Sequence, residues 1–173
     1  MHSKPTQAIK SPKMSNSTFF NIVGNTCGLD GVILGIADFV KRLPERQYRI
    51  IVGTDSAARD EVQFVTAVTV WRIGNGGIHF WTRSEKTMCH DLRDRIYKET
   101  IHSITLAQEL RGRLKEALGD EFFWDDQIHI DVGENGPTRD FIDTVVGMVK
   151  GYGFEAVIKP ASFGASSVAD RHT

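Results

Sequence analysis

The sequence has little of what marks several specialised protein classes. Only two of its 173 residues are cysteines, Cys27 and Cys89, and they form no CxxC pair. Neither a disulfide scaffold nor a zinc knuckle is therefore expected, and free thiols favour a cytoplasmic location. No apolar run approaches the roughly 18 residues that a membrane span needs. The charges nearly cancel, with 21 Lys+Arg against 22 Asp+Glu, which excludes nucleic-acid binding through bulk positive charge alone but leaves a local basic groove open.

Motifs of two well-known enzyme classes are missing as well. The glycine-rich loop at residues 133–138 leads from a predicted strand into a predicted helix, but it lacks the Lys-Ser or Lys-Thr pair of a Walker loop. No G-x-S-x-G segment is present, so a serine nucleophile on a sharp strand–helix turn is not expected. The remaining composition, with 40% hydrophobic and 25% charged residues, fits one globular domain.

Two periodicities alternate along the chain and predict its strands and helices. Runs rich in β-branched and aromatic residues predict strands at 48–54, 63–72, 78–83, 127–132 and 154–159. Apolar residues spaced by three or four predict helices at 30–41, 91–118 and 138–150. Residues 1–18 carry three lysines among serine, threonine, proline and asparagine, so we expect a flexible leader followed by one domain at 19–173.

The order of the predicted elements indicates an α/β fold. After the first helix the order is β-β-β-α-β-α-β, and a short C-terminal helix is expected near Ser166. An Asn-Gly-Gly turn at 75–77 joins two of the first three strands, which predicts an antiparallel meander. A meander followed by β-α-β units predicts a mixed five-stranded sheet with helices packed on it. Right-handed crossovers place the strand at 127–132 beside the first strand, in the centre of the sheet.

Four acidic residues suggest a common site: Asp55, Glu99, Asp131 and Asp170. Asp55 and Asp131 end two strands that are expected to be neighbours, and ligands bind at the carboxyl ends of such strands. Glu99 lies at the edge of the buried stripe of the long helix, and Asp170 lies near the C-terminus. Converging carboxylates repel one another until a cation balances them, and their hard oxygen ligands suit Mg²⁺ or Mn²⁺.

Each acid also has a purely structural interpretation. An Asp before Ser, as at Asp55, often forms only a turn. Glu99 taken alone is typical of a solvated helix flank, and Asp170 lies where chain ends are usually exposed. Asp131, between apolar strand residues and a glycine-rich loop, is least easily explained in this way. The four residues therefore indicate a site only as a set.

Three short sequence motifs contain Asp55, Asp131 and Asp170. They are Gly-Thr-Asp-Ser at 53–56, His-Ile-Asp-Val-Gly at 129–133, and the run 158–171, which ends in Gly-Ala-Ser-Ser-Val-Ala-Asp-Arg. In this order, and with this order of elements, they resemble the ribonuclease-H-like superfamily and, within it, the YkuK-type family of small bacterial proteins, which are predicted nucleases. The resemblance covers about residues 20–173, so it implies a ribonuclease-H-like fold for the whole expected domain.

The resemblance implies a two-metal nuclease whose catalytic and metal-binding residues are the four acids. Asp55 would bridge two Mg²⁺ or Mn²⁺ ions, Glu99 and Asp131 would hold one ion, and Asp170 the other. Two ions about 4 Å apart clamp the scissile phosphate in that mechanism. The implied partner is a nucleic acid, whether RNA, DNA or a hybrid. A non-catalytic module that keeps the fold and binds nucleic acid or another partner is the alternative.

Four further residues are candidates for contacts with the substrate: Ser56, His129, Lys159 and Arg171. His129 and Asp131 are two residues apart on a predicted strand, so their side chains share a face. His129 either orients water or phosphate, or is a histidine packed beneath a helix. Lys159 either contacts phosphate or is a solvated strand end. These alternatives stay open at the level of the sequence.

Overall fold

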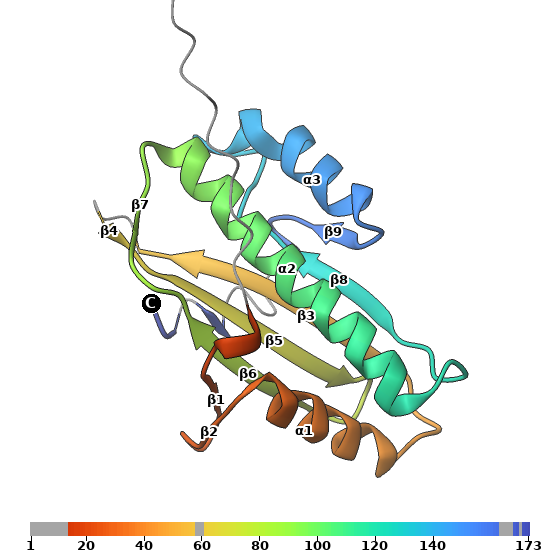
Figure 1. Cartoon of the computed structure of the whole chain (residues 1–173). Coiled ribbons are helices and arrows are strands. Elements are labelled where there is room, and N and C mark those ends of the chain that lie inside the picture. The colour runs from red at the N-terminus through yellow and green to blue at the C-terminus, as the bar shows by residue number, and fades with distance from the viewer. Residues whose placement is uncertain (1–13, 58–60, 163–167, 170) are drawn as a thin grey trace, which may run out of the picture.

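The computed structural model describes residues 14–57, 61–162, 168–169 and 171–173. Within them the chain forms three α-helices, nine strands and two short 3₁₀ turns (Figure 1). The strands are β1 (Phe19–Asn21), β2 (Thr26–Cys27), β3 (Tyr48–Ser56), β4 (Glu61–Val62), β5 (Phe64–Arg72), β6 (Gly77–Arg83), β7 (Thr87–Met88), β8 (Asp125–His129) and β9 (Glu155–Val157). The helical elements are η1 (Met14–Asn16), α1 (Leu29–Lys41), α2 (Leu92–Leu118), η2 (Arg139–Phe141) and α3 (Ile142–Gly151).

Seven strands form the main sheet, in the order β2-β1-β6-β5-β3-β8-β9. The expected meander is β3-β5-β6, which is antiparallel throughout, whereas β8 and β9 run parallel to β3. The expected position of the strand at 127–132 beside the first strand is confirmed, because β8 pairs with β3. The predicted count of five strands is wrong. The chain adds β1 and β2 beyond β6, and a separate two-stranded ribbon of β4 and β7.

The sequence carries little signal for the added strands β1 and β2. β1 and β2 are three and two residues long and lie next to Asn and Gly residues, so they carry no alternation that could be recognised. β1 enters the sheet through long-range pairing with β6, in which Phe19 lies opposite Thr82. Phe19 is fully buried in the core. Burial of this aromatic ring, rather than local strand propensity, accounts for the position of β1.

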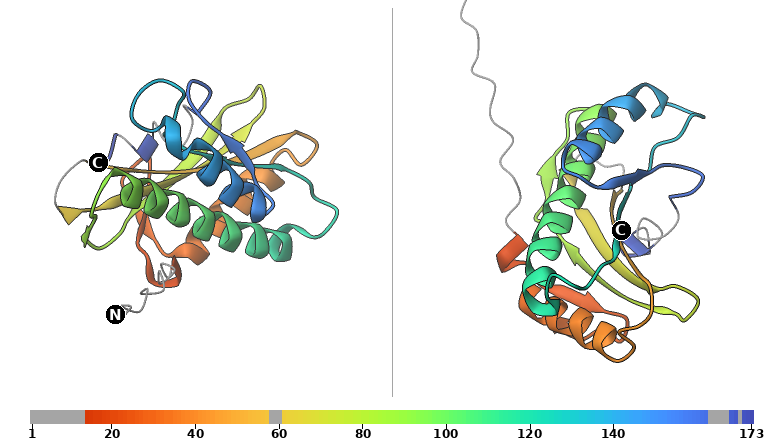
Figure 2. Two further views of the ribbon diagram at one scale, coloured as in Figure 1. Left: turned by 90° about the horizontal axis from the view of Figure 1, so that it is seen from above. Right: turned by 90° about the vertical axis from the view of Figure 1, so that its right-hand side faces the viewer.

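Helices α1, α2 and α3 cover one face of the sheet, and the C-terminal segment lies on the other face (Figure 2). The main core fills the space between the helices and the sheet. Its fully buried members include Leu29, Val32, Ile36, Val68, Val70, Leu106, Leu110, Leu114 and Ile128. A smaller cluster on the other face contains Ile51, Val65, Ala67, Trp81 and Ala169. The two clusters together explain why the central strands β3 and β5 are buried on both sides.

The C-terminal segment is attached to its face of the sheet by Trp81 and Arg83. The ring of His172 stacks on Trp81 at a centroid distance of 3.9 Å. The guanidinium group of Arg83 donates two hydrogen bonds to the carbonyl oxygen of His172, at 2.7 and 3.2 Å. The segment therefore packs against the C-terminal end of β6.

The expected leader, residues 1–18, is described only from residue 14 onward. Met14 is buried and belongs to the main core, so the turn of η1 packs on the domain. The expected helix near Ser166 lies outside the described residues.

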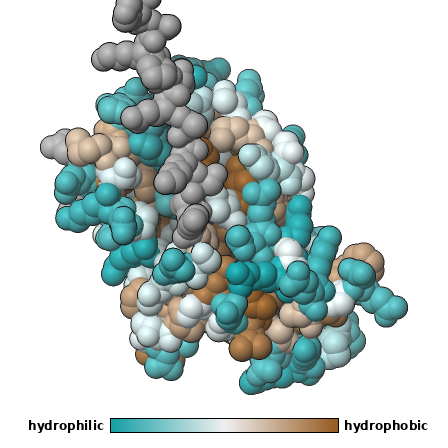
Figure 3. All heavy atoms as spheres, viewed as in Figure 1, coloured by the Kyte–Doolittle hydropathy of each residue, from teal (hydrophilic) through white to brown (hydrophobic). Residues whose placement is uncertain are grey.

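The surface on the helix side is mostly hydrophilic where the structure describes it, and hydrophobic residues reach it in scattered places (Figure 3). Leu34 of α1 is an exposed apolar residue, with 70% of its area accessible to solvent. Single exposed apolar residues of this kind are ordinary on protein surfaces. No helix among the described residues is both long and apolar enough to cross a membrane.

Candidate functional site

The end of β3 presents different chemistry on its two faces. Thr54 and Ser56 point toward α2, because the Thr54 hydroxyl lies 2.8 Å from that of Ser103 and the Ser56 hydroxyl contacts Glu99. Side chains alternate along a strand, so Asp55 points toward the opposite face, where the C-terminal segment packs. Asp55 thus lies at the sheet end between the helix layer and the C-terminal segment.

Glu99 is a buried carboxyl group in the middle of this arrangement. It lies in the first third of α2, only 9% of it is exposed, and Ser56 Oγ donates a 2.5 Å hydrogen bond to its Oε1. Its pKa is raised to about 8, mainly by burial. The charges of Asp55 and Asp131 also raise it, while the Ser56 hydrogen bond and the charge of Arg95 lower it. The three acids are therefore close enough for their charges to interact, although they come from β3, α2 and the loop after β8.

Asp131 lies two residues after the end of β8 and is paired with a lysine from the neighbouring chain segment. Lys159 Nζ lies 2.7 Å from Asp131 Oδ1. The backbone supports this pair, because the Lys159 N–H donates to the Val132 carbonyl oxygen at 2.9 Å. A Cβ on Gly133 would come within 3.1 Å of the Lys159 Cβ, so glycine allows the two segments to lie this close. The Lys159 ammonium group thus balances one of the site's carboxylates.

Asp170 lies outside the described residues. Its neighbour Ala169 is fully buried in the cluster that contains Ile51 and Val65, on the face to which Asp55 points. Arg171, the last predicted substrate contact, is exposed. The described neighbours of position 170 therefore approach the β3 end from the side opposite α2.

His129 is buried on the face of β8 away from the helices. Its Nε2 lies 3.3 Å from the Gln127 side-chain oxygen, and Gln127 in turn donates to Glu155 at 2.9 Å. Burial, together with the positive charge of Arg49, lowers its pKa to about 4. At neutral pH the ring is uncharged. It can orient a neighbour through a hydrogen bond, but it has no extra proton to give.

The carboxylate groups of the acids are suitable ligands for a hard divalent cation, but the described side chains do not converge on one point. Carboxylate oxygens are the ligands that Mg²⁺ and Mn²⁺ prefer. Among the residues that the structure describes, no three such side chains converge closely enough to hold one ion. One oxygen of Glu99 accepts from Ser56, and one oxygen of Asp131 pairs with Lys159.

A buried chain of hydroxyl groups beside the acids was missed by sequence reasoning. Thr54 lies 3.0 Å from Thr66 and 2.8 Å from Ser103, which is one helical turn after Glu99 on α2. The available signal was the spacing of the polar residues Glu99 and Ser103, four positions apart beside a largely apolar stripe. Their partners on β3 are more than 40 residues away in the sequence, so the contacts themselves leave no local pattern.

Comparisons with known proteins agree with this architecture. A family model described as "Ribonuclease H-like" matches residues 31–173, which is most of the chain. The chain belongs to the ribonuclease H-like family. It is also 32% identical over 168 residues to the "Uncharacterized protein YkuK" of Bacillus subtilis (strain 168), covering 90% of this chain and 96% of that protein. No solved structure matches the chain significantly. The resemblance to YkuK-type ribonuclease-H-like proteins is thus confirmed.

Proposed function

We propose that this ribonuclease H-like protein is a metal-dependent nuclease that hydrolyses phosphodiester bonds of RNA or DNA. The observation that carries the proposal is the buried Glu99, whose pKa is raised to about 8 next to Asp55 and Asp131. Such a group destabilises the fold when it is ionised, and strongly shifted carboxyl groups in this position are typical of functional sites. Membership of the family gives a nucleic-acid-related function its general support.

In this proposal Asp55, Glu99, Asp131 and Asp170 hold Mg²⁺ or Mn²⁺. Two bound ions would activate water and stabilise charge on the phosphate. Ser56 fixes the orientation of Glu99 through its 2.5 Å hydrogen bond, and so acts as a positioning residue rather than as a substrate contact. Lys159 pairs with Asp131 in the free protein. With a cation bound at Asp131, the Lys159 ammonium group would be available to a phosphate oxygen of the substrate.

The products follow from the atoms that exchange. Water attacks phosphorus, the bond from phosphorus to the 3′ oxygen breaks, and a proton passes to that oxygen. One product then ends in a 5′-phosphate and the other in a 3′-hydroxyl group. His129 does not supply this proton at neutral pH, because its pKa is lowered to about 4.

Calorimetric titration of Mn²⁺ into the wild type, Asp55→Asn and Asp120→Asn tests the site. Asp120 is exposed and follows the far end of α2. We expect saturable binding that is lost in Asp55→Asn and kept in Asp120→Asn. Cleavage of labelled RNA, DNA and hybrid strands should follow the same pattern. Normal cleavage by Asp55→Asn would show that the site has been assigned to the wrong residues.

The ion pair between Lys159 and Asp131 favours one alternative, a binding module without catalysis. Here a lysine already neutralises a carboxylate that a nuclease would need for its metal. Such a module would bind nucleic acid or another partner with the same affinity with and without Mg²⁺, and would cleave nothing. Binding measured in EDTA and in Mg²⁺ therefore separates the two functions.

A further inference from the structure

A pocket of about 320 Å³ lies near the end of β3. It is lined by Ala57, Glu61, Gln63, Val65, Lys86 and Thr173. Val65 lies opposite Asp55 in the pairing of β3 with β5, and side chains that face each other in this way lie about 4.5–5.5 Å apart. Ala57 follows Asp55 by two residues. The pocket therefore shares a wall with the candidate site.

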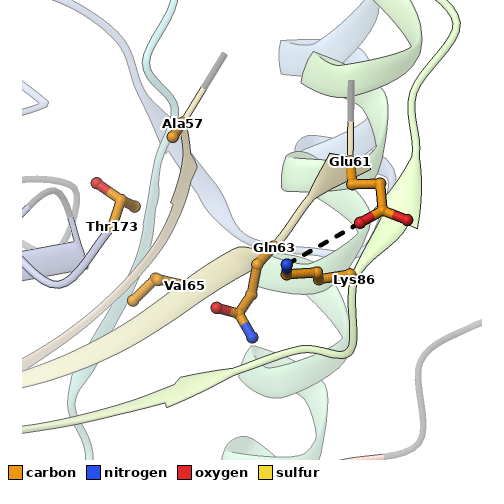
Figure 4. A pocket seen from close by; sticks show the side chains of 6 residues that line it. All are labelled: Ala57, Glu61, Gln63, Val65, Lys86 and Thr173. Atoms are coloured by element: carbon orange, nitrogen blue, oxygen red, sulfur yellow. Dashed lines mark ion pairs between the residues drawn. The ribbon is translucent and has the colours of Figure 1, made fainter. Parts of the chain in front are cut away.

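The walls of the pocket differ in chemistry. In Figure 4, Ala57, Val65 and Thr173 lie on one side, and the polar side chains Glu61, Gln63 and Lys86 lie on the other. Gln63 is fixed in place, since its side-chain nitrogen donates to the Ser84 carbonyl oxygen at 2.9 Å. The side with Ala57 and Val65, the apolar wall, also carries the polar residue Thr173. An apolar wall that faces a few placed polar groups is the common form of a small-molecule site.

Lys86 is the positively charged residue of this pocket, and its ion pair with Glu61 is weak. Its Nζ lies 4.0 Å from Glu61 Oε2, and about two thirds of each side chain is exposed. Exposed pairs at this distance contribute little stability, so a phosphate group can replace Glu61 as the partner of Lys86. The ribbon of β4 and β7 supports both residues, because Glu61 begins β4 and Lys86 directly precedes β7.

We infer that this pocket binds one nucleotide of a single-stranded nucleic acid, next to the phosphate that metal ions at Asp55 would hold; this inference rests on the proposed function. Its volume is near the lower end of ligand pockets and suits a single nucleotide unit. A base enters such a pocket only when it is unpaired and unstacked from its neighbours. The apolar wall receives the base or sugar, and Lys86 binds a neighbouring phosphate. The preferred substrate is therefore single-stranded at the cleavage position.

Two pairs of variants test the pocket. Lys86→Gln removes the cation, and Lys115→Gln is its control on the exposed far end of α2, about 24 Å along the helix from Glu99. Ala57→Phe fills the pocket, and Ala117→Phe is its control at another exposed position of α2. Fluorescence anisotropy measures binding to a labelled 12-nucleotide RNA, the same sequence as DNA, and each strand in a duplex, all in Ca²⁺.

We expect the wild type to bind single strands more tightly than duplexes. Ala57→Phe should weaken single-strand binding by about tenfold, since it excludes one stacked nucleotide. Lys86→Gln should weaken binding and lower the slope of log affinity against log salt concentration by about 1. Both controls should bind like the wild type, and Mn²⁺ affinity should be unchanged in all four variants.

Three results would overturn the inference. If Lys86→Gln and Ala57→Phe bind like their controls while Mn²⁺ binding and cleavage are intact, the pocket is unused although the proposed function stands. Tighter binding of duplexes by the wild type would overturn the single-strand preference. If the wild type binds no nucleic acid, the proposed function fails and the inference fails with it.

Discussion

At Glu99 the fold turns an ordinary carboxyl group into one that keeps its proton at neutral pH. The folded-state pKa of about 8 lies above the usual value of 4.5, so the folded protein binds a proton more tightly than the unfolded chain does. Stability from this group is complete at low pH and is lost as the pH rises toward 8. The buried histidines act in the opposite direction, since the pKa values of His102 and His129 are lowered to about 4.

Because of these opposite effects, there is a pH range in which Glu99 determines how the free energy of unfolding changes with pH. His79 and His172 also have lowered pKa values, so the histidine contributions are complete above about pH 6.5, the usual value for this residue. Between pH 6.5 and 8 the metal-free protein should lose at most about 2 kcal/mol of unfolding free energy. Urea unfolding at a series of pH values measures this loss. A flat profile across the window would show that Glu99 is ionised throughout.

The variant Glu99→Gln should not lose unfolding free energy between pH 6.5 and 8. It keeps the size of the side chain and a hydrogen-bonding oxygen for Ser56, but it carries no charge to be repelled by Asp55 and Asp131. We expect the variant to be more stable than the wild type at pH 8 without metal and to bind Mn²⁺ more weakly. Glu116→Gln, an exposed position on the same helix, is the control and should follow the wild type in both measurements.

Among the elements, β3 determines how the acids are presented. Its hydroxyl-bearing face holds α2 through Thr54 and Ser56, and its other face carries Asp55. The sequence predicted the strand and the position of Asp55, because a β-branched run ended in an acid. It could not show that Ser56 holds Glu99, since that contact joins residues 43 positions apart.

The variant Ser56→Ala tests this role of β3. The hydrogen bond from Ser56 favours the ionised form of Glu99, so its loss should raise the pKa of Glu99 further. The pH at which Mn²⁺ binding reaches half its maximum should rise by a similar amount. Thr54→Val removes the neighbouring hydroxyl group from the same face and should lower stability without moving that midpoint. Equal shifts in both variants would contradict a specific role for Ser56.

The helices and long strands were predictable for a common reason. The helix at 91–118 and the strands at 48–54 and 63–72 carry enough residues for one period to be recognised, and all three are present with ends shifted by at most two residues. The helix at 138–150 begins instead with the turn η2, and α3 starts at Ile142. Short elements lack such a period, which is why β1, β2 and the β4–β7 ribbon were missed.

For the whole molecule, the added strand β1 should contribute as much to the free energy of unfolding as a central strand of the sheet. Phe19 is fully buried beneath the helices, whereas Ile22, three residues later, is 77% exposed. Phe19→Ala should lower the free energy of unfolding by about 3–5 kcal/mol. Ile22→Ala should change it by less than about 0.5 kcal/mol. Chemical unfolding of both variants gives the comparison, and a small loss for Phe19→Ala would mean that β1 is not part of the cooperative core.

The two outermost strands of the main sheet, β2 and β9, are only two and three residues long. An outer strand exposes unpaired N–H and C=O groups, to which a strand of another chain can add. Strands this short offer such a chain very few backbone hydrogen bonds. The protein is therefore protected at both margins against growth into strand-linked polymers, and its encounters with other macromolecules should depend on side chains rather than on backbone pairing.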